Sequence, residues 1–324
     1  MAKYVPDVSS RRWVIIADGR ENRPDETDDT IPTSDRCPFC AGNEHLTSHE
    51  MYRVGTGKAG ESGWEVRVIL NKYPITDIHE VIIHSPSEKD LHHLPKEHIQ
   101  KVFQTYRQRF VEYCKKGQVI IFCNRGEHAG ASIEHPHSQL VVLPNQINIS
   151  ALKREPLDNI VEENTFFNIY CPDFSQWPYE VWIAPKKKTS MFGDITDEEI
   201  KDLIDIYVKV MKKLETIHES KSRTGRGFSY NFYIYPKENW YIRIIPRFVY
   251  RAGFELGTGL SVNVYDPKDA AIDLREVADH LPASPAGRKN PNNKSQDNPK
   301  DEVIERQENE IEMLKGKLTK LGIQ

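Results

Sequence analysis

The segment EHPHSQLVVLP, residues 134–144, carries two histidines on either side of one proline. Proline fixes its own φ and favours extended geometry in the residue before it, so this segment is stiff. In an extended chain the side chains of His135, His137 and Gln139 point to one side, and the apolar side chains that follow take the other. Three groups able to bind, attack or donate would then share one face. A solvated strand edge with incidental histidines is the alternative.

A neutral imidazole at this position can act as a nucleophile near pH 7. Attack on phosphorus would form a phosphoramidate and divide one difficult transfer into two easier steps. Such a ring needs its remote nitrogen held as N–H, commonly by a backbone carbonyl, so that the attacking nitrogen keeps its lone pair. Charge on the phosphoryl oxygens needs donors already in place, and the amide of Gln139 can supply one.

The stretch NRGEHAGAS, residues 124–132, precedes this segment. Gly126 and Gly130 permit close approach of the backbone, and Ser132 adds a hydroxyl group. Backbone N–H groups in such a turn can surround an anion. An ordinary glycine-containing turn is the alternative.

Two further groups of residues near the N-terminus could bind phosphate or a metal ion. Arg20 and Arg23 flank a turn and could clamp phosphates bidentately, although solvated surface arginines are the commoner outcome. Cys37 and Cys40 have the spacing of metal ligands.

The elements that must position these residues occur twice, about one hundred residues apart. HEVIIHSP, from His79, and YEVWIAP, from Tyr179, each precede a predicted helix, a strand and a last strand that ends at a proline. Thr196 and Glu199 form a capping box before the second helix. The predicted buried stripes comprise Ile99, Val102, Phe103, Tyr106, Phe110 and Tyr113 in the first helix, and Ile200, Leu203, Ile204, Tyr207, Met211 and Leu214 in the second.

The repeat predicts an α+β fold of two tandem units with antiparallel sheets and packed helices. A single mixed domain with chance similarity is the alternative. When the halves are aligned at Pro144 and Pro246, His137 falls opposite Asn239 and Gln139 opposite Tyr241. Only the first copy therefore carries the histidines, which predicts one chemical site per chain.

The expected boundaries are 1–150 for the first domain, 151–281 for the second and 282–300 for a disordered linker. Residues 301–324 form either a short coiled coil or an amphipathic helix that docks on its own domain.

Composition excludes several classes of protein. A hydrophobic content of 38% and a charged content of 28% are typical of a globular protein. The net charge of -4 gives no basic surface for nucleic acid, and no apolar run is long enough to span a membrane. The N-terminus lacks the apolar stretch of a signal peptide, so we expect a cytoplasmic location. Five cysteines in 324 residues do not indicate a disulfide framework.

The motifs GRENRP, CPFC, NKYP, HEVIIHSP, NRGEHAGASIEHPHSQ and AGFELGTGL occur in this order. Over roughly residues 4–280 the chain resembles the galactose-1-phosphate uridylyltransferase family of the histidine-triad superfamily. The His-Pro-His-x-Gln element after a Gly-Ala-Ser turn is quite specific to that family, and the other motifs support it. The resemblance implies two histidine-triad-like halves, a homodimer and ping-pong transfer of a nucleoside monophosphate through a nucleotidyl-histidine.

The resemblance also implies residue roles. His137 matches the nucleophile, and Gln139 matches the amide that holds the nucleotidyl phosphate. Glutamine favours transfer over hydrolysis because it cannot act as an acid or base on water. The positions that match substrate-binding residues are Arg20, Arg23, Asn71, Asn124, Gly130, Ser132 and Glu255.

A Zn²⁺ site is implied as well, with one departure from the family. Cys37, Cys40 and His135 match three ligands, but Glu88 stands where the family usually has a histidine. A carboxylate oxygen is an acceptable zinc ligand. His84, His45 or His49 are alternatives for the fourth ligand, and folding without metal is a further one. The histidines that hold a second metal in some members have no counterpart in ENWYIRIIPRF.

Three functions remain open. The first is transfer of UMP from a UDP-sugar to a hexose 1-phosphate, and the second is an ADP-sugar or dinucleoside-polyphosphate phosphorylase that uses the same histidine. The third is a non-catalytic, zinc-stabilised protein that binds nucleotide sugars and assembles through its C-terminal helix.

Overall fold

In the part of the chain that the structure describes, ten antiparallel strands form one sheet, which positions His137 and Gln139. A computed structural model describes residues 2–7, 12–17, 20, 37–147, 149, 152, 154–221 and 227–277. The predicted linker (282–300) and C-terminal helix (301–324) lie outside the described residues, as does the junction at residues 150–151.

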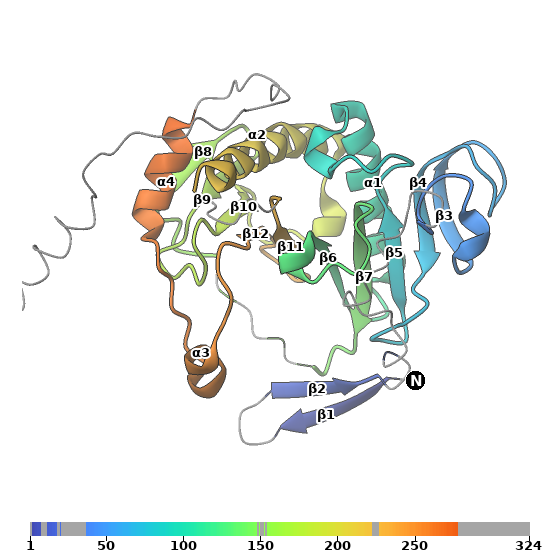
Figure 1. Ribbon diagram of the computed structural model, residues 1–324, viewed down its shortest axis with the longest axis horizontal. Coiled ribbons are helices and arrows are strands. Elements are labelled where there is room, and N and C mark those ends of the chain that lie inside the picture. Colours follow the sequence, from blue (N-terminus) through green and yellow to red (C-terminus); the bar gives the residue numbers. More distant parts are fainter. Residues whose placement is uncertain are drawn as a thin grey trace, which may run out of the picture. The chain divides into compact units, whose positions relative to one another are not determined.

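The strands run in the order β3-β4-β5-β7-β6-β11-β12-β10-β9-β8 across the sheet, and β1 and β2 form a separate hairpin (Figure 1). Their bounds are β1 Lys3–Asp7, β2 Arg12–Ile16, β3 Glu50–Gly55, β4 Trp64–Leu70, β5 His79–Ile83, β6 Gln118–Arg125, β7 His137–Leu143, β8 Ile160–Glu163, β9 Phe167–Tyr170, β10 Val181–Pro185, β11 Tyr230–Ile234 and β12 Ile242–Pro246.

The central pair of the sheet, β6 and β11, joins the two halves of the chain. Asn124 pairs with Asn231 at this seam. From the seam outward, one half runs β6, β7, β5, β4, β3 and the other runs β11, β12, β10, β9, β8. The antiparallel pairing expected from the sequence is therefore found within one continuous sheet, and the strands predicted at the closing prolines, β7 and β12, are confirmed.

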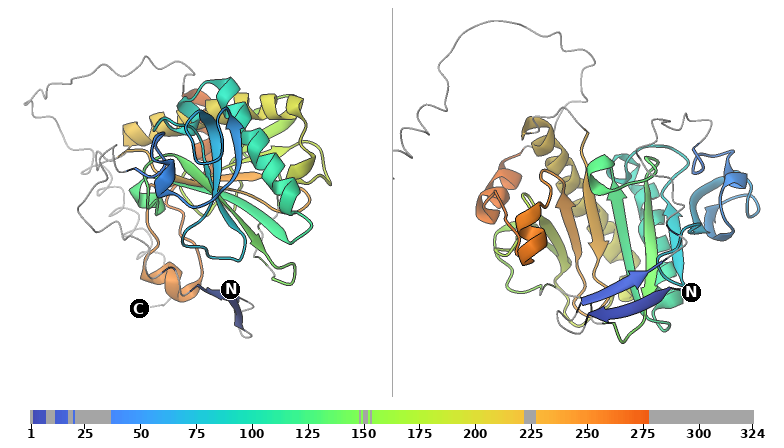
Figure 2. Two further views of the ribbon diagram at one scale, coloured as in Figure 1. Left: turned by 90° about the vertical axis from the view of Figure 1, so that its right-hand side faces the viewer. Right: turned by 60° about the horizontal axis from the view of Figure 1, so that its bottom comes forward.

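Two long helices pack on one face of this sheet (Figures 1 and 2). They are α1, Lys96–Tyr113, and α2, Asp197–Lys221. Shorter helices are α3, Gly253–Thr258, and α4, Pro267–Glu276, with single-turn 3₁₀ helices η3 Glu44–Leu46, η4 Leu91–His93, η5 Glu127–Ala129 and η6 Phe192–Asp194.

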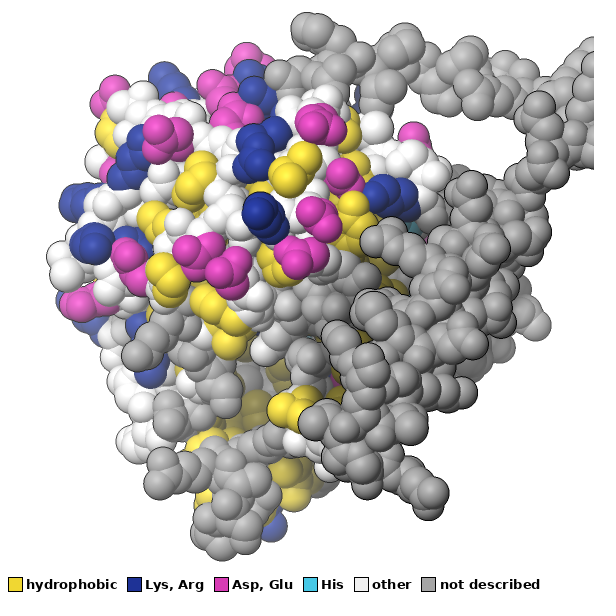
Figure 3. All heavy atoms as spheres, turned by 90° about the vertical axis from the view of Figure 1, so that its left-hand side faces the viewer, with side chains coloured by type: hydrophobic (Ala, Val, Ile, Leu, Met, Phe, Trp, Pro, Cys, Tyr) yellow, Lys and Arg dark blue, Asp and Glu magenta, His cyan; other side chains and the backbone are white. Residues whose placement is uncertain are grey.

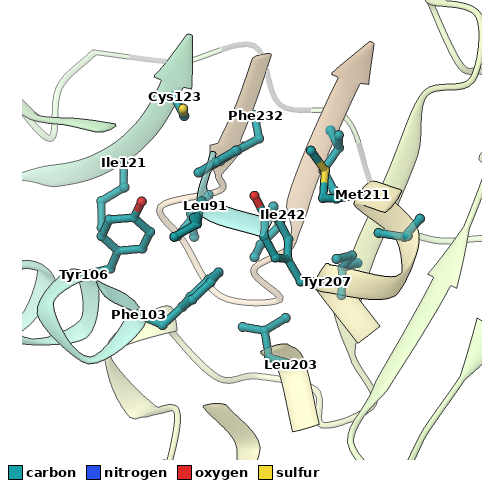
Figure 4. Packing of buried hydrophobic residues seen from close by; sticks show 14 of the residues in the cluster. Leu91, Phe103, Tyr106, Ile121, Cys123, Leu203, Tyr207, Met211, Phe232 and Ile242 are labelled. Carbon is teal, nitrogen blue, oxygen red and sulfur yellow. The ribbon is translucent and has the colours of Figure 1, made fainter. Parts of the chain in front are cut away.

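Both predicted helical stripes are confirmed, because every one of their side chains is buried. Figure 4 shows Phe103 and Tyr106 of α1 and Leu203 and Tyr207 of α2 in one hydrophobic core. The predicted capping box is also present: the hydroxyl of Thr196 accepts from the backbone N–H of Glu199, and the Glu199 carboxylate accepts from the N–H of Thr196.

The surface seen in Figure 3 intermixes Lys and Arg with Asp and Glu side chains and with scattered hydrophobic ones. Among the described residues visible there, no large patch of one charge is seen. Among the described residues, no helix combines the length and apolar character needed to cross a membrane.

Candidate active site

A pocket of about 230 Å³ lies on the sheet face opposite α1 and α2. Alternation along β7 produces this division, since Leu140 and Val142 enter the core with the helices while His137 and Gln139 face the pocket. The predicted site residues that line it are Arg20, Asn71, Ser132, His137 and Gln139.

His137 is the first residue of β7, and only 6% of it is exposed. Its Nδ1 lies 2.8 Å from the backbone oxygen of His135. A carbonyl can only accept, so Nδ1 carries the proton and Nε2 keeps the lone pair. The ring of Phe39 packs edge-on against the imidazole, with 5.1 Å between ring centroids. The protonation pattern needed for a nucleophilic histidine is thus present in the fold.

Gln139 is oriented by a second histidine, His79 on β5. The Nδ1 atom of His79 accepts from the backbone N–H of Ile75 at 3.1 Å, so the proton of a neutral ring lies on Nε2. That Nε2–H donates to the side-chain oxygen of Gln139 at 2.9 Å, and the amide of Asn71 reaches the same oxygen at 3.4 Å. With its oxygen held by two donors, Gln139 presents its N–H groups to other acceptors.

Beside the pocket, two thiols, one imidazole and one carboxylate converge. The ligand atoms of Cys37, Cys40, Glu88 and His135 all lie within 4.8 Å of one another. The Nδ1 atom of His135 is 3.7 Å from the sulfur of Cys37 and 3.5 Å from that of Cys40. Its Nε2–H donates to the backbone oxygen of Ser85 at 2.8 Å, which leaves the Nδ1 lone pair aimed at the sulfurs. This donor set fits a tetrahedral zinc ion.

The two thiols of this cluster differ in acidity. Burial opposes ionisation of Cys37, but hydrogen bonds from His135, the backbone of Phe39 and Cys40 together outweigh it and lower the pKa of Cys37. Burial, together with the neighbouring Cys37 and Glu88, raises the pKa of Cys40 to about 12. Without a cation the cluster would hold one thiolate at most, and a bound dication would favour the second.

Among the alternatives for the fourth ligand, His84 directs its ring into the core, away from the cysteine cluster. Its Nε2 is 2.7 Å from the hydroxyl oxygen of Ser138 and 2.8 Å from that of Tyr106, inside the core. Burial and the nearby His137 and His135 hold the pKa of His84 well below its usual value, so the ring is neutral. His84 therefore does not join the cysteine cluster, and neither do His45 or His49.

Arg20 reaches the pocket from the N-terminal segment and donates to the backbone oxygen of Tyr73 at 2.8 Å. Arg23 lies outside the described residues. Three other predicted binding residues do not line this pocket. Asn124 accepts from the amide of Asn231 at 2.8 Å in the central seam, Gly130 ends η5 with a φ of 72°, and Glu255 caps α3.

Sequence reasoning missed two residues that support the site. His79 opens a strand that the repeat had identified, but its contact with Gln139 depends on the register between β5 and β7. Phe39 lies between the two cysteines, and its packing on His137 follows from the fold of the cysteine turn. Leu46 and Ile69 at the pocket wall lie outside every motif, and Lys72, Tyr73 and Ile133 lie within motifs but had no predicted role.

The chain is similar to several known enzymes. Residues 70–145 match the family model described as galactose-1-phosphate uridyl transferase, N-terminal domain. The chain is 24% identical to ADP-glucose phosphorylase of Arabidopsis thaliana, over 84% of this chain and 92% of that protein. It is also 24% identical to galactose-1-phosphate uridylyltransferase of Thermotoga maritima, over 82% of this chain and 95% of that protein.

A solved structure has the same fold. The crystal structure of an ADP-glucose phosphorylase from Arabidopsis thaliana with bound ADP-glucose superposes with a TM-score of 0.64 at 24% identity. The match covers 86% of this chain and all of that one.

Proposed function

We propose that the chain is a nucleotidyltransferase of the galactose-1-phosphate uridylyltransferase type, which acts on nucleotide sugars through His137; the match of residues 70–145 to that family's model supports this. The observation that carries this proposal is the 2.8 Å hydrogen bond from His137 Nδ1 to the backbone oxygen of His135. It keeps the ring in the tautomer whose Nε2 can attack phosphorus.

In the first half-reaction, the Nε2 lone pair of His137 attacks the α-phosphorus of the nucleotide sugar. The bond from that phosphorus to the bridging oxygen breaks, and the sugar 1-phosphate leaves with the electron pair. The ring then carries a positive charge, which the His135 carbonyl stabilises through the Nδ1–H. In the second half-reaction, a phosphate oxygen of the acceptor attacks the same phosphorus, and the N–P electrons return to Nε2.

Three groups that line the pocket would stabilise charge on the phosphoryl oxygens. Gln139 would donate from its amide, Ser132 from its hydroxyl and Arg20 from its guanidinium. Asn71 would bind the nucleotide from the pocket wall. Arg23, Asn124, Gly130 and Glu255 keep the binding roles that the resemblance implies.

The leading pair of substrates is a UDP-sugar and a hexose 1-phosphate, and the family model matched by residues 70–145 supports it. A phosphorylase that uses inorganic phosphate as acceptor and an ADP-sugar as donor is the second candidate. It is supported by the similarity to ADP-glucose phosphorylase over most of both chains.

We further propose that Cys37, Cys40, Glu88 and His135 hold one zinc ion. When bound, the ion would link the cysteine turn and the loop that carries Glu88 to the segment that contains His135 and His137. The same His135 that would ligate through Nδ1 offers its backbone carbonyl to His137, so a fixed His135 fixes the orientation of the reacting ring.

A homodimer and a cytoplasmic location complete the proposal. The dimer is supported by a segment around α3 that exposes many large apolar side chains, since such a surface is costly in water. These residues are Tyr250, Phe254, Leu256, Leu260, Val262 and Val264. The molar mass of the purified protein by light scattering tests the dimer.

The decisive experiment is covalent labelling with UDP-glucose and ADP-glucose that carry ³²P in the α-phosphate. Label should survive denaturation, be released by mild acid and be absent from His137→Ala. Galactose 1-phosphate should discharge the label in the uridylyltransferase, and inorganic phosphate should discharge it in the phosphorylase. Labelling that persists in His137→Ala, or no label from either nucleotide sugar, would refute the nucleophile.

A further inference from the structure

A second cluster of metal-ligating side chains lies on the helical side of the sheet, away from the pocket. Glu215 of α2 faces two consecutive histidines of η4, His92 and His93. Its Oε2 is 2.8 Å from Nε2 of His93 and 3.3 Å from Nε2 of His92. The three ligand-type atoms all lie within 4.8 Å of one another.

The protein holds these histidines in place before any ligand arrives. Leu91, the first residue of η4, is 1% exposed and lies in the hydrophobic core near Phe232 and Ile242 (Figure 4). The ring of His92 is itself buried, with edge contacts to Phe228 and Tyr230. Immobilised rings lose little further freedom when they ligate an ion.

On the other side of the cluster, His93 and Glu215 reach solvent. The side chain of His93 is 40% exposed and that of Glu215 is 23% exposed. An ion can therefore enter without unfolding, and water can complete its coordination. The arrangement resembles a site with three protein ligands and one open position.

The separations suit a transition metal. With metal–ligand bonds of about 2.0–2.1 Å, tetrahedral geometry places ligand atoms about 3.3 Å apart. The two contacts to Glu215 Oε2, at 2.8 and 3.3 Å, need only small side-chain rotations to reach that spacing. Two imidazoles and one carboxylate suit Zn²⁺ and similar first-row dications, and they disfavour Ca²⁺ and Mg²⁺, which prefer oxygen ligands.

We propose that His92, His93 and Glu215 bind one divalent transition metal ion of the zinc type, independent of the cysteine cluster. The ion would tie the segment before α1 to α2, which belongs to the other half of the chain. It would also stabilise the contacts that connect η4 with the segment that carries His135 and His137. Asp90, next to η4, pairs with Arg125, and Arg125 donates to the backbone oxygen of Glu134, directly before His135.

The test is metal binding to the full-length protein after removal of bound metal with a chelator. Zinc content and affinity are measured by equilibrium dialysis with mass-spectrometric metal analysis. The wild type should bind two equivalents, and His93→Ala and Glu215→Gln should bind one at the same concentrations. We expect the second dissociation constant to rise at least about 100-fold, since loss of even an outer-shell partner costs 10–100-fold.

Glu219→Gln is the matched control, because Glu219 is exposed on the same helix one turn further on. It should keep both equivalents. Cobalt separates the two sites, since thiolate ligands give intense charge-transfer absorption and imidazole and carboxylate ligands do not. Glu215→Gln should retain the charge-transfer band while binding one equivalent less.

Three results would overturn the proposal. The first is a wild type whose bound cobalt all shows the thiolate charge-transfer band, and the second is a Glu215→Gln variant that binds as many equivalents as the wild type with unchanged affinity. The third is loss of the same equivalent from Glu219→Gln, which would indicate weak surface binding. Labelling of His137 by a nucleotide sugar is measured in the same variants. It reports on the proposed transfer reaction separately, because neither variant changes a pocket residue.

Discussion

The Nε2 atom of His79 lies 2.9 Å from the side-chain oxygen of Gln139, and this contact determines which end of the amide faces the pocket. An amide rotated by half a turn would direct its oxygen at the phosphoryl oxygens and repel them. The fold thus uses a buried histidine on β5 to direct a donor on the neighbouring strand β7.

Removing the amide should slow formation of the nucleotidyl-enzyme more than removing the histidine that orients it. We expect Gln139→Leu to lower the single-turnover rate about 100- to 1000-fold, because one preorganised donor is lost. His79→Ala should lower it by up to about 100-fold through misplacement of the amide. Rapid-quench measurements with the labelled nucleotide sugar give both rates.

His79→Gln provides the conservative control, since its amide N–H can replace the Nε2–H donor. It should recover part of the rate lost in His79→Ala, with KM little changed. Equal loss in His79→Gln and His79→Ala would indicate a packing role for His79 and would contradict the orienting role.

Glu88 is the unusual member of the cysteine cluster, and its removal should weaken metal binding at that cluster. We expect Glu88→Ala to raise the dissociation constant of the cysteine site by at least about tenfold. The charge-transfer absorption of bound cobalt reports this site alone. His45→Ala and His49→Ala should behave as the wild type, because both side chains are exposed and outside the cluster. Weaker metal binding in either histidine variant, with unchanged binding in Glu88→Ala, would show that the histidine and not Glu88 is the fourth ligand.

Glu50 gives the fold an acid-sensitive ion pair. Burial would raise the pKa of Glu50, but hydrogen bonds from Arg53 and Arg67 outweigh it and lower the pKa to about 2 from an ordinary 4.5. A carboxyl with a depressed pKa in the folded state stabilises that state above the ordinary value. The contribution is complete above about pH 4.5 and is lost as the pH falls towards 2.

Urea denaturation of the wild type and Glu50→Gln across this range measures the effect. The difference in free energy of unfolding should be largest at neutral pH and should shrink from pH 4.5 towards 2. A difference that is independent of pH over this interval would show that the charge on Glu50 does not contribute.

Two glycines that flank η5 allow the steric and the backbone contributions of an added Cβ atom to the free energy of unfolding to be measured separately. Gly126 and Gly130 both have positive φ, of 81° and 72°. A Cβ atom on Gly126 would lie 2.3 Å from the hydroxyl oxygen of Ser229, whereas one on Gly130 would meet open space. Both alanine variants should lose about 1–2 kcal/mol of stability from the left-handed backbone. Gly126→Ala should lose more, and its transition temperature should be the lower of the two.

Much of the local structure is predictable because it depends on short-range patterns. The 3.6-residue period fixes the buried stripes of α1 and α2, and Thr196 and Glu199 mark where α2 begins. The stiff segment around Pro136 also places His137 and Gln139 on the pocket side of β7, as expected.

What remained unpredicted depends on pairing between distant strands. The sequence alone offers no way to place Asn124 opposite Asn231, because that pairing joins strands about one hundred residues apart. The same holds for His79, since its distance from Gln139 is set by the register of β5 on β7. Glu88 was found through a family position, and the distances within its cluster required the fold.

The antiparallel pairing of β6 with β11 has a consequence for how the protein can be divided. A chain cut between Ile147 and Arg154 would leave each fragment with an open strand edge, where a row of N–H and C=O groups has lost its partners. Each fragment can restore the lost backbone hydrogen bonds by pairing its open edge with that of the other fragment. Separately expressed halves should therefore reassemble when mixed and self-associate when kept apart.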